Sequence, residues 1–471
     1  MTELTIIIQW LFLLYFIALN VGYTLLNVIS FFSIGRYVHG RVLTRLPEIF
    51  TGFEPKISVL VPAYNEEANI AASIRSLLQL DYPDYEVVVI NDGSRDRTLD
   101  VLREEFALQE FPEAFLVRLQ TRPVRGLYRS LVHPQLRVID KVNGGKADAL
   151  NAGINSARYP LFCGVDADSI LQQDSLRLVA RPFLEDPSTV ACGGTIRIAN
   201  GCQMSGGALV RAGVPRSYLA LCQTVEYLRA FLFGRAGWSP LNALLIISGA
   251  FGLFDKEVVV QVGGYRTDSI GEDMELVVRL HRILRKRRQK YRIAFVPDPV
   301  CWTEAPEDLQ TLKNQRVRWQ RGLSDSLYLN RDLLFSRGGG AVGWIAFPFT
   351  ILFEWLSPIV EAGGYLFFVI AYLMGSTSFI FAILFLLIAF LCGTLLSISA
   401  LFLEEAEFHT YPKARHVLVL LVATIAENFG YRQLNALWRL NGLRKWMFNS
   451  SVTWGEMKRT ASLQEKPQGV Q

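Results

Sequence analysis

Two aspartates directly follow an apolar stretch in the middle of the chain. The segment "YPLFCGVDADS" (159–169) is typical of a buried strand that ends at Asp166 and Asp168. Alternate residues of a strand lie on the same face, so both carboxylates can point to one place at its end. Two like charges this close need a cation, a shared proton or full contact with water. Because Asp and Ser are common in turns, a solvated turn is the alternative for this segment taken alone.

Three other segments predict the strands and helices that would position this pair. They are "KISVLVPAYNEEANI" (56–70), "YEVVVINDGS" (85–94) and "LRVIDKVNGGKADALNAGINSA" (136–157). Each begins with an apolar strand and continues into a turn, and the first and third go on into a helix. Strands that alternate with helices favour an α/β fold with a largely parallel sheet, and such sheets bind ligands beyond the carboxyl ends of their strands.

Acidic residues follow three of these strands, at the edge where such a sheet binds ligands. They are Glu66, Asp92 and the pair Asp166 and Asp168. Paired carboxylates suit a hard cation such as Mg²⁺ or Mn²⁺, and Mg²⁺ usually binds one or two carboxylates together with phosphate oxygens. Asp92 could accept a hydrogen bond from a nucleobase or ribose, or it could cap a turn. No GxGxxG follows a strand and no GxxxxGK[ST] is present, so dinucleotide and P-loop binding are not supported.

Two later helices carry further candidates. "SIGEDMELVVRLHRI" places Glu272 and Asp273 at a helix start, where an acid can act as a general base or simply meet the helix dipole. "NQRVRWQRG" places Gln315, Arg318 and Trp319 on one helix face. Arg can pair with phosphate and Trp can stack on a sugar ring. The alternative is that this helix is amphipathic and lies on the membrane surface. We expect both roles, each on a different face of the same helix.

The composition indicates a membrane protein with a large globular domain. Of 471 residues, 51% are hydrophobic and 19% are charged, with a mean hydropathy of +0.25. The first apolar run, 4–34, exceeds the roughly 20 residues that span a bilayer. It is too long for a signal peptide and lacks a basic start. The arginines that follow it place the globular domain in the cytoplasm. We therefore expect an integral protein of the inner (plasma) membrane.

The apolar segments set the expected topology. They are 5–33, 341–374, 376–403 and 415–434. Basic residues after the last one predict a cytoplasmic C-terminus, which requires an odd number of spans. Either 341–374, which contains Pro348 and Pro358, folds as two short elements, or 415–434 lies in the interface. Glu354, Glu361 and Asn428 are expected to face a protein interior or a water-filled path, or to join helices by hydrogen bonds.

The remaining composition argues against several classes of protein. The run "RLHRILRKRRQKYRI" (279–293) could suggest nucleic acid, but a cytoplasmic face beside anionic lipid is the preferred interpretation. The six cysteines form no CxxC and the five histidines are scattered. Neither a zinc site nor a disulfide framework is therefore predicted.

Taken in order, the motifs resemble a known family. "VPAYNEE", "NDGS", "NGGKADALNAG", "DADS", "GED" and "QRVRW" resemble the membrane-embedded family 2 glycosyltransferases, the synthases of cellulose, chitin, hyaluronan and poly-N-acetylglucosamine. The resemblance covers residues 52–335 and extends into the flanking membrane segments. It implies a GT-A fold and inverting transfer from a UDP-sugar to a growing β-linked polysaccharide. The expected domains are an N-terminal transmembrane helix (1–35), the GT-A domain with interface helices (52–335), transmembrane and interface helices (341–434) and a cytoplasmic tail (435–471).

On the donor side, the resemblance assigns Asp92 to uridine and places Glu66 and Lys146 beside the donor. Asp166 and Asp168 match the DxD motif that holds the metal, Mg²⁺ or Mn²⁺, and the diphosphate. A metal there acts as a Lewis acid toward the charge that develops on the diphosphate.

On the acceptor side, Asp273 matches the catalytic base, with Glu272 beside it in the same motif. A base in this place takes the proton of the attacking sugar hydroxyl. Gln315, Arg318 and Trp319 match the QxxRW signature, which lines the acceptor end and, through the arginine, the diphosphate.

The tail segment "TWGEMKR" (453–459) resembles the Trp-Gly gating segment of hyaluronan and chitin synthases, without their usual Trp-Gly-Thr-Arg or Trp-Gly-Thr-Lys. Trp454, Lys458 and Arg459 are therefore expected to close over the donor, and the polymer is expected to cross the membrane through the same chain. A closing loop of this kind excludes water from the donor.

The absence of a cyclic-di-nucleotide regulatory domain, together with the length, favours the poly-N-acetylglucosamine or hyaluronan type. The expected partners are the UDP-sugar, a polysaccharide or lipid-linked acceptor, the bilayer and a small membrane subunit, without nucleic acid. Two other functions stay open: single-sugar transfer to a membrane lipid, and a non-catalytic membrane scaffold.

Overall fold

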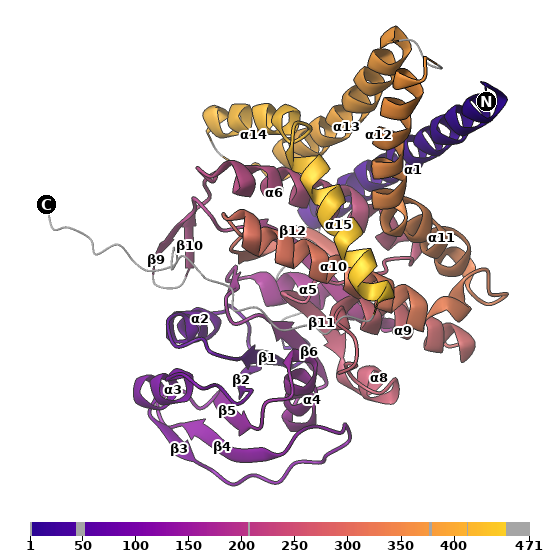
Figure 1. Cartoon of the computed structure of the whole chain (residues 1–471). Coiled ribbons are helices and arrows are strands. Elements are labelled where there is room, and N and C mark those ends of the chain that lie inside the picture. Colours follow the sequence, from indigo (N-terminus) through magenta and orange to yellow (C-terminus); the bar gives the residue numbers. More distant parts are fainter. Residues whose placement is uncertain (1, 44–51, 206–207, 376–378, 412, 449–471) are drawn as a thin grey trace, which may run out of the picture.

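The computed structural model describes residues 2–43, 52–205, 208–375, 379–411 and 413–448 (Figure 1). An α/β domain forms the lower part of the view, and long helices from both ends of the chain extend above it. The N-terminal helix, α1 (Thr2–Leu43), lies beside the C-terminal helices α12 (Ser357–Leu373) and α13 (Phe379–Glu407).

Ten strands of the described residues form one sheet, in the order β3-β4-β5-β2-β1-β6-β11-β8-β12-β7. They are β1 (Ile57–Ala63), β2 (Tyr85–Asn91), β3 (Leu108–Glu110), β4 (Val124–Ser130), β5 (Leu136–Lys141), β6 (Leu161–Val165), β7 (Ile170–Leu171), β8 (Thr189–Ile198), β11 (Phe251–Asp255) and β12 (Arg292–Thr303). The expected parallel arrangement is confirmed for β5, β2, β1 and β6. The whole sheet is mixed, because β11 and β4 pair antiparallel with their neighbours. A short hairpin, β9 (Gln203–Ser205) and β10 (Ala208–Arg211), stands apart from it.

Helices accompany the sheet. They are α2 (Ile70–Leu77), α3 (Thr98–Phe106), α4 (Lys146–Ser156), α5 (Ser175–Glu185), α6 (Tyr218–Arg229), α7 (Ala236–Trp238), α8 (Lys256–Gln261), α9 (Glu272–Lys286) and α10 (Leu309–Leu329). Helix α4 begins directly after the glycine-rich turn, as the sequence predicts. It packs closely on the sheet because Gly153 has no side chain: a Cβ there would lie 3.0 Å from Ile90 and 3.2 Å from Leu60. Strand β1 is buried at every residue except Pro62, which is half-buried, as its apolar run predicts.

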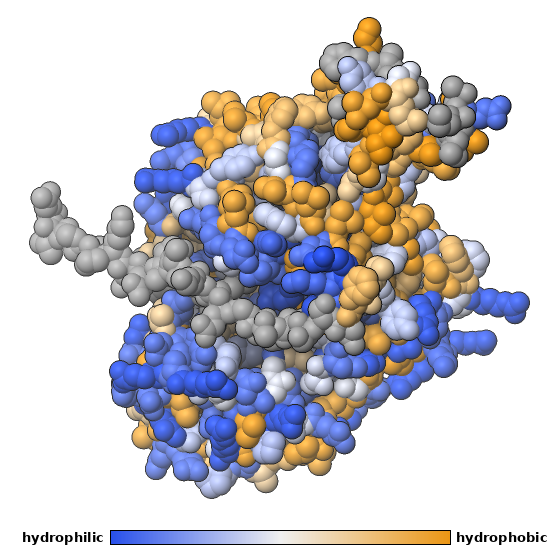
Figure 2. All heavy atoms as spheres, in the orientation of Figure 1, coloured by the Kyte–Doolittle hydropathy of each residue, from blue (hydrophilic) through white to orange (hydrophobic). Residues whose placement is uncertain are grey.

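The apolar helices extend away from this domain. In the described ranges, Thr5–Gly40 is long and apolar enough to cross a bilayer, and the bent pair Val342–Trp355 and Ser357–Leu373 passes the same test when taken as one span. Apolar side chains of α1 such as Trp10 and Leu14 are about two-thirds exposed, at 66% and 64%. Figure 2 shows hydrophobic side chains gathered over the upper part of the molecule and hydrophilic ones over the α/β domain.

Both apolar segments between which the sequence left a choice are interrupted. The helical run 342–355, made of η5 (Val342–Ala346), α11 (Phe347–Thr350) and η6 (Ile351–Trp355), accommodates Pro348 between two π-helical segments. It meets α12 at an angle of 42°, just before Pro358. The segment 415–434 is divided between α14 (Ala414–Ala426) and α15 (Tyr431–Met447), which Gly430 joins at a φ of 88°. The side of the membrane on which each end lies, and the domain boundaries, remain predictions.

Candidate active site

The acidic residues that follow the central strands line one cavity at the carboxyl edge of the sheet. The cavity has a volume of about 1970 Å³, and Glu66, Asp92, Asp166 and Asp168 all contribute to its wall. Their convergence is the arrangement that the sequence predicts. The pair itself lies in a turn directly after β6, closed by a hydrogen bond from the Ser169 N–H to the Asp166 backbone oxygen (3.0 Å), so the turn expected as the alternative is present and it faces the cavity.

Asp92 is buried and holds the glycine-rich turn in place. Its carboxylate pairs with the ammonium of Lys141 (2.6 Å) and accepts hydrogen bonds from the backbone N–H groups of Gly144 (3.0 Å) and Gly145 (2.7 Å). Lys141 is fully buried and also pairs with Asp148 (2.5 Å). We name these five residues the donor-side cluster, after the role that the sequence resemblance predicts for Asp92. The sequence reasoning missed Lys141, whose signal is a lysine at the end of a strand that is buried along its whole length.

The positive φ of Gly145, 89°, explains the glycine at that position of the turn, since L side chains rarely adopt it. Gly93 has a φ of 67°, and a Cβ on it would lie 2.7 Å from the backbone nitrogen of Asn143. Gly93 therefore lets the turns after β2 and β5 approach each other closely, whereas Gly145 is required by its backbone conformation alone.

Lys146, the first residue of α4, lies among acidic groups. Its ammonium is 2.5 Å from Asp166 and 3.6 Å from Glu272, and it donates to the backbone oxygen of Gly249 (3.1 Å). Burial alone would lower the pKa of Lys146, but the neighbouring carboxylates outweigh it and raise that pKa. Burial raises the pKa of Glu272, and the charge of Asp273 adds to the effect while Lys146 opposes it. The single ammonium of Lys146 therefore balances the charge of the carboxylates around it, Asp166, Glu272 and Asp273.

Asp273 lies in the first turn of α9 and faces the cavity. One carboxylate oxygen accepts a hydrogen bond from the N–H of Gly249 (2.9 Å), and the other accepts one from the N–H of Met274 (2.8 Å). A Cβ on Gly249 would lie 3.0 Å from the Lys146 ammonium and 3.3 Å from the Asp273 carboxylate. Gly249 therefore sets the spacing between these two groups. The sequence reasoning missed it, and "ISGAF" is its only local signal.

Helix α10 presents the three predicted residues on one face. Gln315, Arg318 and Trp319 all line the cavity. Gln315 is buried and its side-chain oxygen has no hydrogen-bond partner among the described residues. The indole of Trp319 is 42% exposed, and the guanidinium of Arg316 lies 4.5 Å from its centre. Arg316 pairs in turn with Glu226 (2.8 Å), so α6 fixes the back of this face.

Comparisons with known families agree with this geometry. Residues 58–203 match the family described as Glycosyl transferase family 2, and residues 162–396 match Glycosyl transferase family group 2. The chain belongs to the family 2 glycosyltransferases. Its mixed sheet with flanking helices is the expected GT-A fold.

This glycosyltransferase is 33% identical over 282 residues to a poly-beta-1,6-N-acetyl-D-glucosamine synthase of Staphylococcus aureus, covering 59% of this chain and 57% of that relative. It is 31% identical over 266 residues to the synthase of the same name from Staphylococcus epidermidis, covering 56% and 54%. The match thus spans little more than half the length of these relatives. Among solved structures, the mannosyltransferase PcManGT from Pyrobaculum calidifontis, in complex with GDP-Man and Mn²⁺, has a TM-score of 0.46 and 18% identity, covering 92% of this chain and 100% of that one.

The cavity of the glycosyltransferase continues past α10 to a wall built by α1, α12, α13 and α15. Glu354, Glu361 and Asn428 all line it, which confirms that these polar groups face the protein interior. Asn428, in the turn after α14, also donates to Thr394 of α13 (3.2 Å), so the expected hydrogen bonding between helical segments holds for it as well. Aromatic side chains complete this wall; they include Phe12, Tyr15, Phe353, Tyr365, Phe368 and Phe390.

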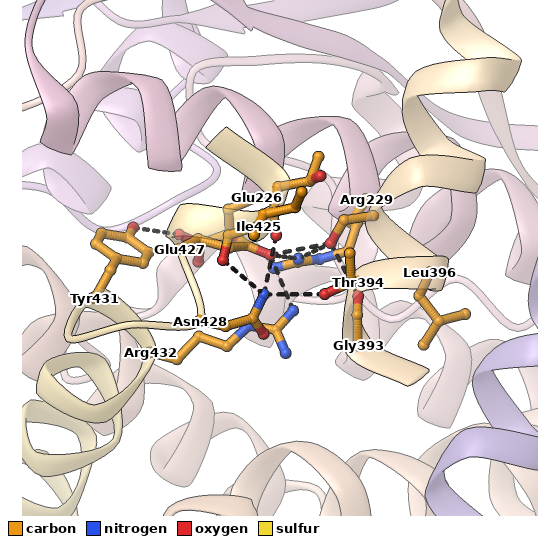
Figure 3. A network of polar contacts seen from close by, with 12 residues as sticks. Glu226, Arg229, Gly393, Thr394, Leu396, Ile425, Glu427, Asn428, Tyr431 and Arg432 are labelled. Carbon is orange, nitrogen blue, oxygen red and sulfur yellow. Dashed lines mark hydrogen bonds and ion pairs between the residues drawn. The ribbon is translucent and has the colours of Figure 1, made fainter. Parts of the chain in front are cut away.

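A buried polar network supports this wall (Figure 3). The carboxylate of Glu427, fully buried, pairs with the guanidinium groups of Arg229 and Arg432 and accepts a hydrogen bond from Ser397 (3.0 Å). Both arginines also line the cavity. Pairing is required here because an isolated charge buried among apolar helices would be costly.

Asp166 and Asp168 offer the ligands expected for a divalent cation. Across the described parts of the chain, no three or more His, Cys, Asp or Glu side chains form a group that could by itself hold a metal ion. Two carboxylates are nevertheless sufficient protein ligands for Mg²⁺ when a phosphate and water supply the rest. The residues therefore fit a metal that binds together with a diphosphate.

The predicted gating residues Trp454, Lys458 and Arg459 lie outside the described residues. The gate remains a prediction from the sequence.

Proposed function

We propose that this glycosyltransferase transfers a sugar from a UDP-sugar to a growing β-linked polysaccharide and inverts the anomeric carbon. One observation carries the proposal: a single cavity joins the carboxylates at the strand ends, the exposed Trp319 and the wall formed by the apolar helices. N-acetylglucosamine is the first sugar to test, because the relatives from Staphylococcus are named for its polymer.

The donor would bind across the strand ends. The donor-side cluster presents Asp92 to the uridine, with Glu66 at the neighbouring strand end. Lys146 and Arg318 would face the diphosphate, which an arginine can bind through two parallel hydrogen bonds. Mg²⁺ or Mn²⁺ held by Asp166 and Asp168 would supply Lewis-acid stabilisation of the diphosphate charge.

Asp273 would serve as the general base. An acceptor hydroxyl attacks the anomeric carbon, its proton passes to the Asp273 carboxylate, and the bond to UDP breaks so that UDP leaves with the electron pair. The hydrogen bond from Gly249 orients the carboxylate toward the cavity. Glu272, whose pKa burial raises, lies beside Lys146 and would adjust the charge near the donor.

The acceptor end of the polymer would lie on Trp319 and Gln315. An indole face offers a stacking platform with little directional specificity, which suits a chain that moves after each addition. The unpartnered oxygen of Gln315 can accept a hydrogen bond from a sugar hydroxyl. The polymer would then leave along the polar and aromatic wall between the apolar helices.

The test is a donor screen on the full chain in lipid nanodiscs, with UDP release and product size measured for each UDP-sugar. We expect one donor to give UDP and a long β-linked polymer. A lipid that carries one sugar would establish non-processive transfer instead. Absence of UDP release with every donor would support a non-catalytic scaffold.

A further inference from the structure

The end of α9 and the residues after it form a strongly basic tip. Residues 282–292, "RILRKRRQKYR", contain seven Lys and Arg and no Asp or Glu. Lys286, Arg287, Arg288 and Lys290 are all exposed. A charge of one sign, concentrated at the end of a helix, attracts ligands of the opposite sign.

An exposed aromatic pair lies in the segment that leads into the apolar helices. Phe335 and Trp344 are each 54% exposed, with ring centres 5.2 Å apart. The indole N–H donates to the backbone oxygen of Ser336 (3.0 Å), which fixes the ring. Ile345, 53% exposed, continues the apolar surface. Tryptophan with one polar contact and an exposed ring is typical of the membrane–water interface.

The basic tip and the aromatic pair form one surface. A Cβ on Gly340 would collide with the guanidinium of Arg285, so the loop before η5 packs directly on α9. Arg282 also pairs with Asp332 (3.3 Å) in the preceding turn. Figure 2 shows hydrophilic side chains projecting beneath a hydrophobic area on the side of the molecule where Figure 1 places α9 and α11.

We propose that this surface, the basic tip together with Phe335 and Trp344, binds the headgroups of anionic phospholipids. The charge is complementary, and the neighbouring aromatic rings can enter the acyl boundary, which a nucleic acid does not offer. The first turn of α9 carries Asp273, about 20 Å from the basic tip along the helix axis. Lipid bound at the C-terminal end of α9 would fix the position of the helix whose first turn carries Asp273.

The test compares lipid retention by the full chain in detergent, using native mass spectrometry with phosphatidylglycerol or phosphatidylcholine added. The variant replaces Lys286, Arg287, Arg288 and Lys290 with Gln. We expect wild type to retain phosphatidylglycerol preferentially and the variant to bind it at least about tenfold more weakly. The matched control replaces four exposed arginines of the α/β domain with Gln: Arg75, Arg103, Arg125 and Arg177. It should retain phosphatidylglycerol as wild type does.

Equal retention of the two lipids by wild type, or equal loss in the control, would overturn the proposal. A second arm adds transfer RNA as a competitor. Displacement of phosphatidylglycerol by RNA at a lower concentration would make the surface a nucleic-acid site and would also overturn it. Trp344→Ser tests the aromatic part and should weaken retention without changing the preference for the anionic lipid.

A second inference comes from Lys146 and rests on the proposed function. Its ammonium contacts the Asp166 carboxylate at 2.5 Å and lies between it and Glu272 at 3.6 Å. Gly249 contributes a third contact through its backbone oxygen. The positive charge of the ammonium thus lies next to Asp166, where a divalent cation bound to the aspartate pair would also lie.

We infer that Lys146 makes cation binding depend on the donor. A divalent ion that arrives alone has to approach Asp166 against the charge of the ammonium. A diphosphate offers Lys146 new oxygen partners, which frees Asp166, and it supplies further ligands to the ion. Cation and nucleotide should therefore bind cooperatively, and removal of the ammonium should uncouple them.

The test measures Mn²⁺ binding to the full chain by electron paramagnetic resonance, with and without UDP. We expect wild type to bind Mn²⁺ weakly alone and more tightly with UDP. Lys146→Met should bind Mn²⁺ at least about tenfold more tightly without UDP, since an opposing charge at this distance is removed. Lys256→Met, which alters a half-buried lysine outside the cavity lining, is the control.

Unchanged Mn²⁺ affinity in Lys146→Met would overturn this inference. The same measurement separates it from the proposed function: cooperative Mn²⁺ and UDP binding without sugar transfer would retain the role of Lys146 and reject the synthase.

Discussion

The two ends of the candidate active site satisfy their polar groups in opposite ways. At the proposed donor end, Asp92 is bound by Lys141 and by two backbone N–H groups of the chain itself. At the acceptor end, the side-chain oxygen of Gln315 is unpartnered within the described structure and Trp319 presents an exposed ring. One end is held by the protein itself, whereas the other has bonding capacity left for a ligand.

This difference matches what the proposed function requires of each end. A nucleotide of constant shape is bound best by groups that need no reorganisation, because ordering them afterwards would cost affinity. A polymer that changes position after each addition needs contacts that can be broken and made again. The comparison therefore predicts that changes at the donor end affect folding and donor affinity together, whereas changes at the acceptor end affect the product.

The largest effect is expected at the boundary between the two ends. Asp273→Asn should reduce transfer by about 10²–10⁴-fold, because the base is lost while the hydrogen bond from Gly249 can be kept. UDP affinity should stay close to that of wild type. UDP release and a separate UDP-binding measurement check the two expectations. Transfer at the wild-type rate would remove Asp273 from the role of base.

Lys141→Met tests whether the donor-side cluster stabilises the fold. The change leaves the buried carboxylates of Asp92 and Asp148 without their ammonium and should lower the free energy of unfolding by about 3–5 kcal/mol. Thermal unfolding of the full chain measures it, with Lys56→Met as the control because the ion pair of Lys56 with Asp84 is exposed. If both variants unfold alike, the donor-side cluster does not carry the stability assigned to it.

At the acceptor end, Trp319→Ala should shorten the polymer and raise the acceptor concentration needed for half-maximal rate by about tenfold. Stability and UDP affinity should remain those of wild type, because the ring is exposed and the donor-side cluster is untouched. Trp319→Phe, which keeps an aromatic face, is expected to restore most of the length. Loss of UDP binding in Trp319→Ala would contradict the division into two ends.

The smallest effect concerns pH. Because burial raises the pKa of Glu272, the folded state binds its proton more tightly than the unfolded state does. This group therefore favours the folded state at low pH, and the contribution is lost as pH rises from about 4.5, the ordinary pKa, through the raised value. Glu272→Gln should flatten this part of the stability profile. Thermal unfolding measured from pH 4 to 7 checks it, and identical slopes for the two proteins would contradict the assignment.

Local sequence patterns determined which segments of this protein form the central strands and the apolar helices. The apolar runs of β1, β2, β5 and β6 determined which segments become central strands, and parallel pairing then brings their carboxyl ends to one edge. The spacing of Gln315, Arg318 and Trp319 determined that they share a face, because helical periodicity depends only on near neighbours. The long apolar runs likewise indicated helices that could cross a bilayer.

Only the tertiary structure decided which distant residues meet. Gly249 orients Asp273 from 24 positions away. Lys146 reaches Glu272 from another helix, and Glu427 pairs with Arg229 across 198 positions. Such contacts depend on how helices pack on the sheet and on one another, and no local pattern encodes a partner so far along the chain. The mixed order of the sheet beyond β6 has the same origin, since a strand such as β11 pairs in the direction that its connections allow.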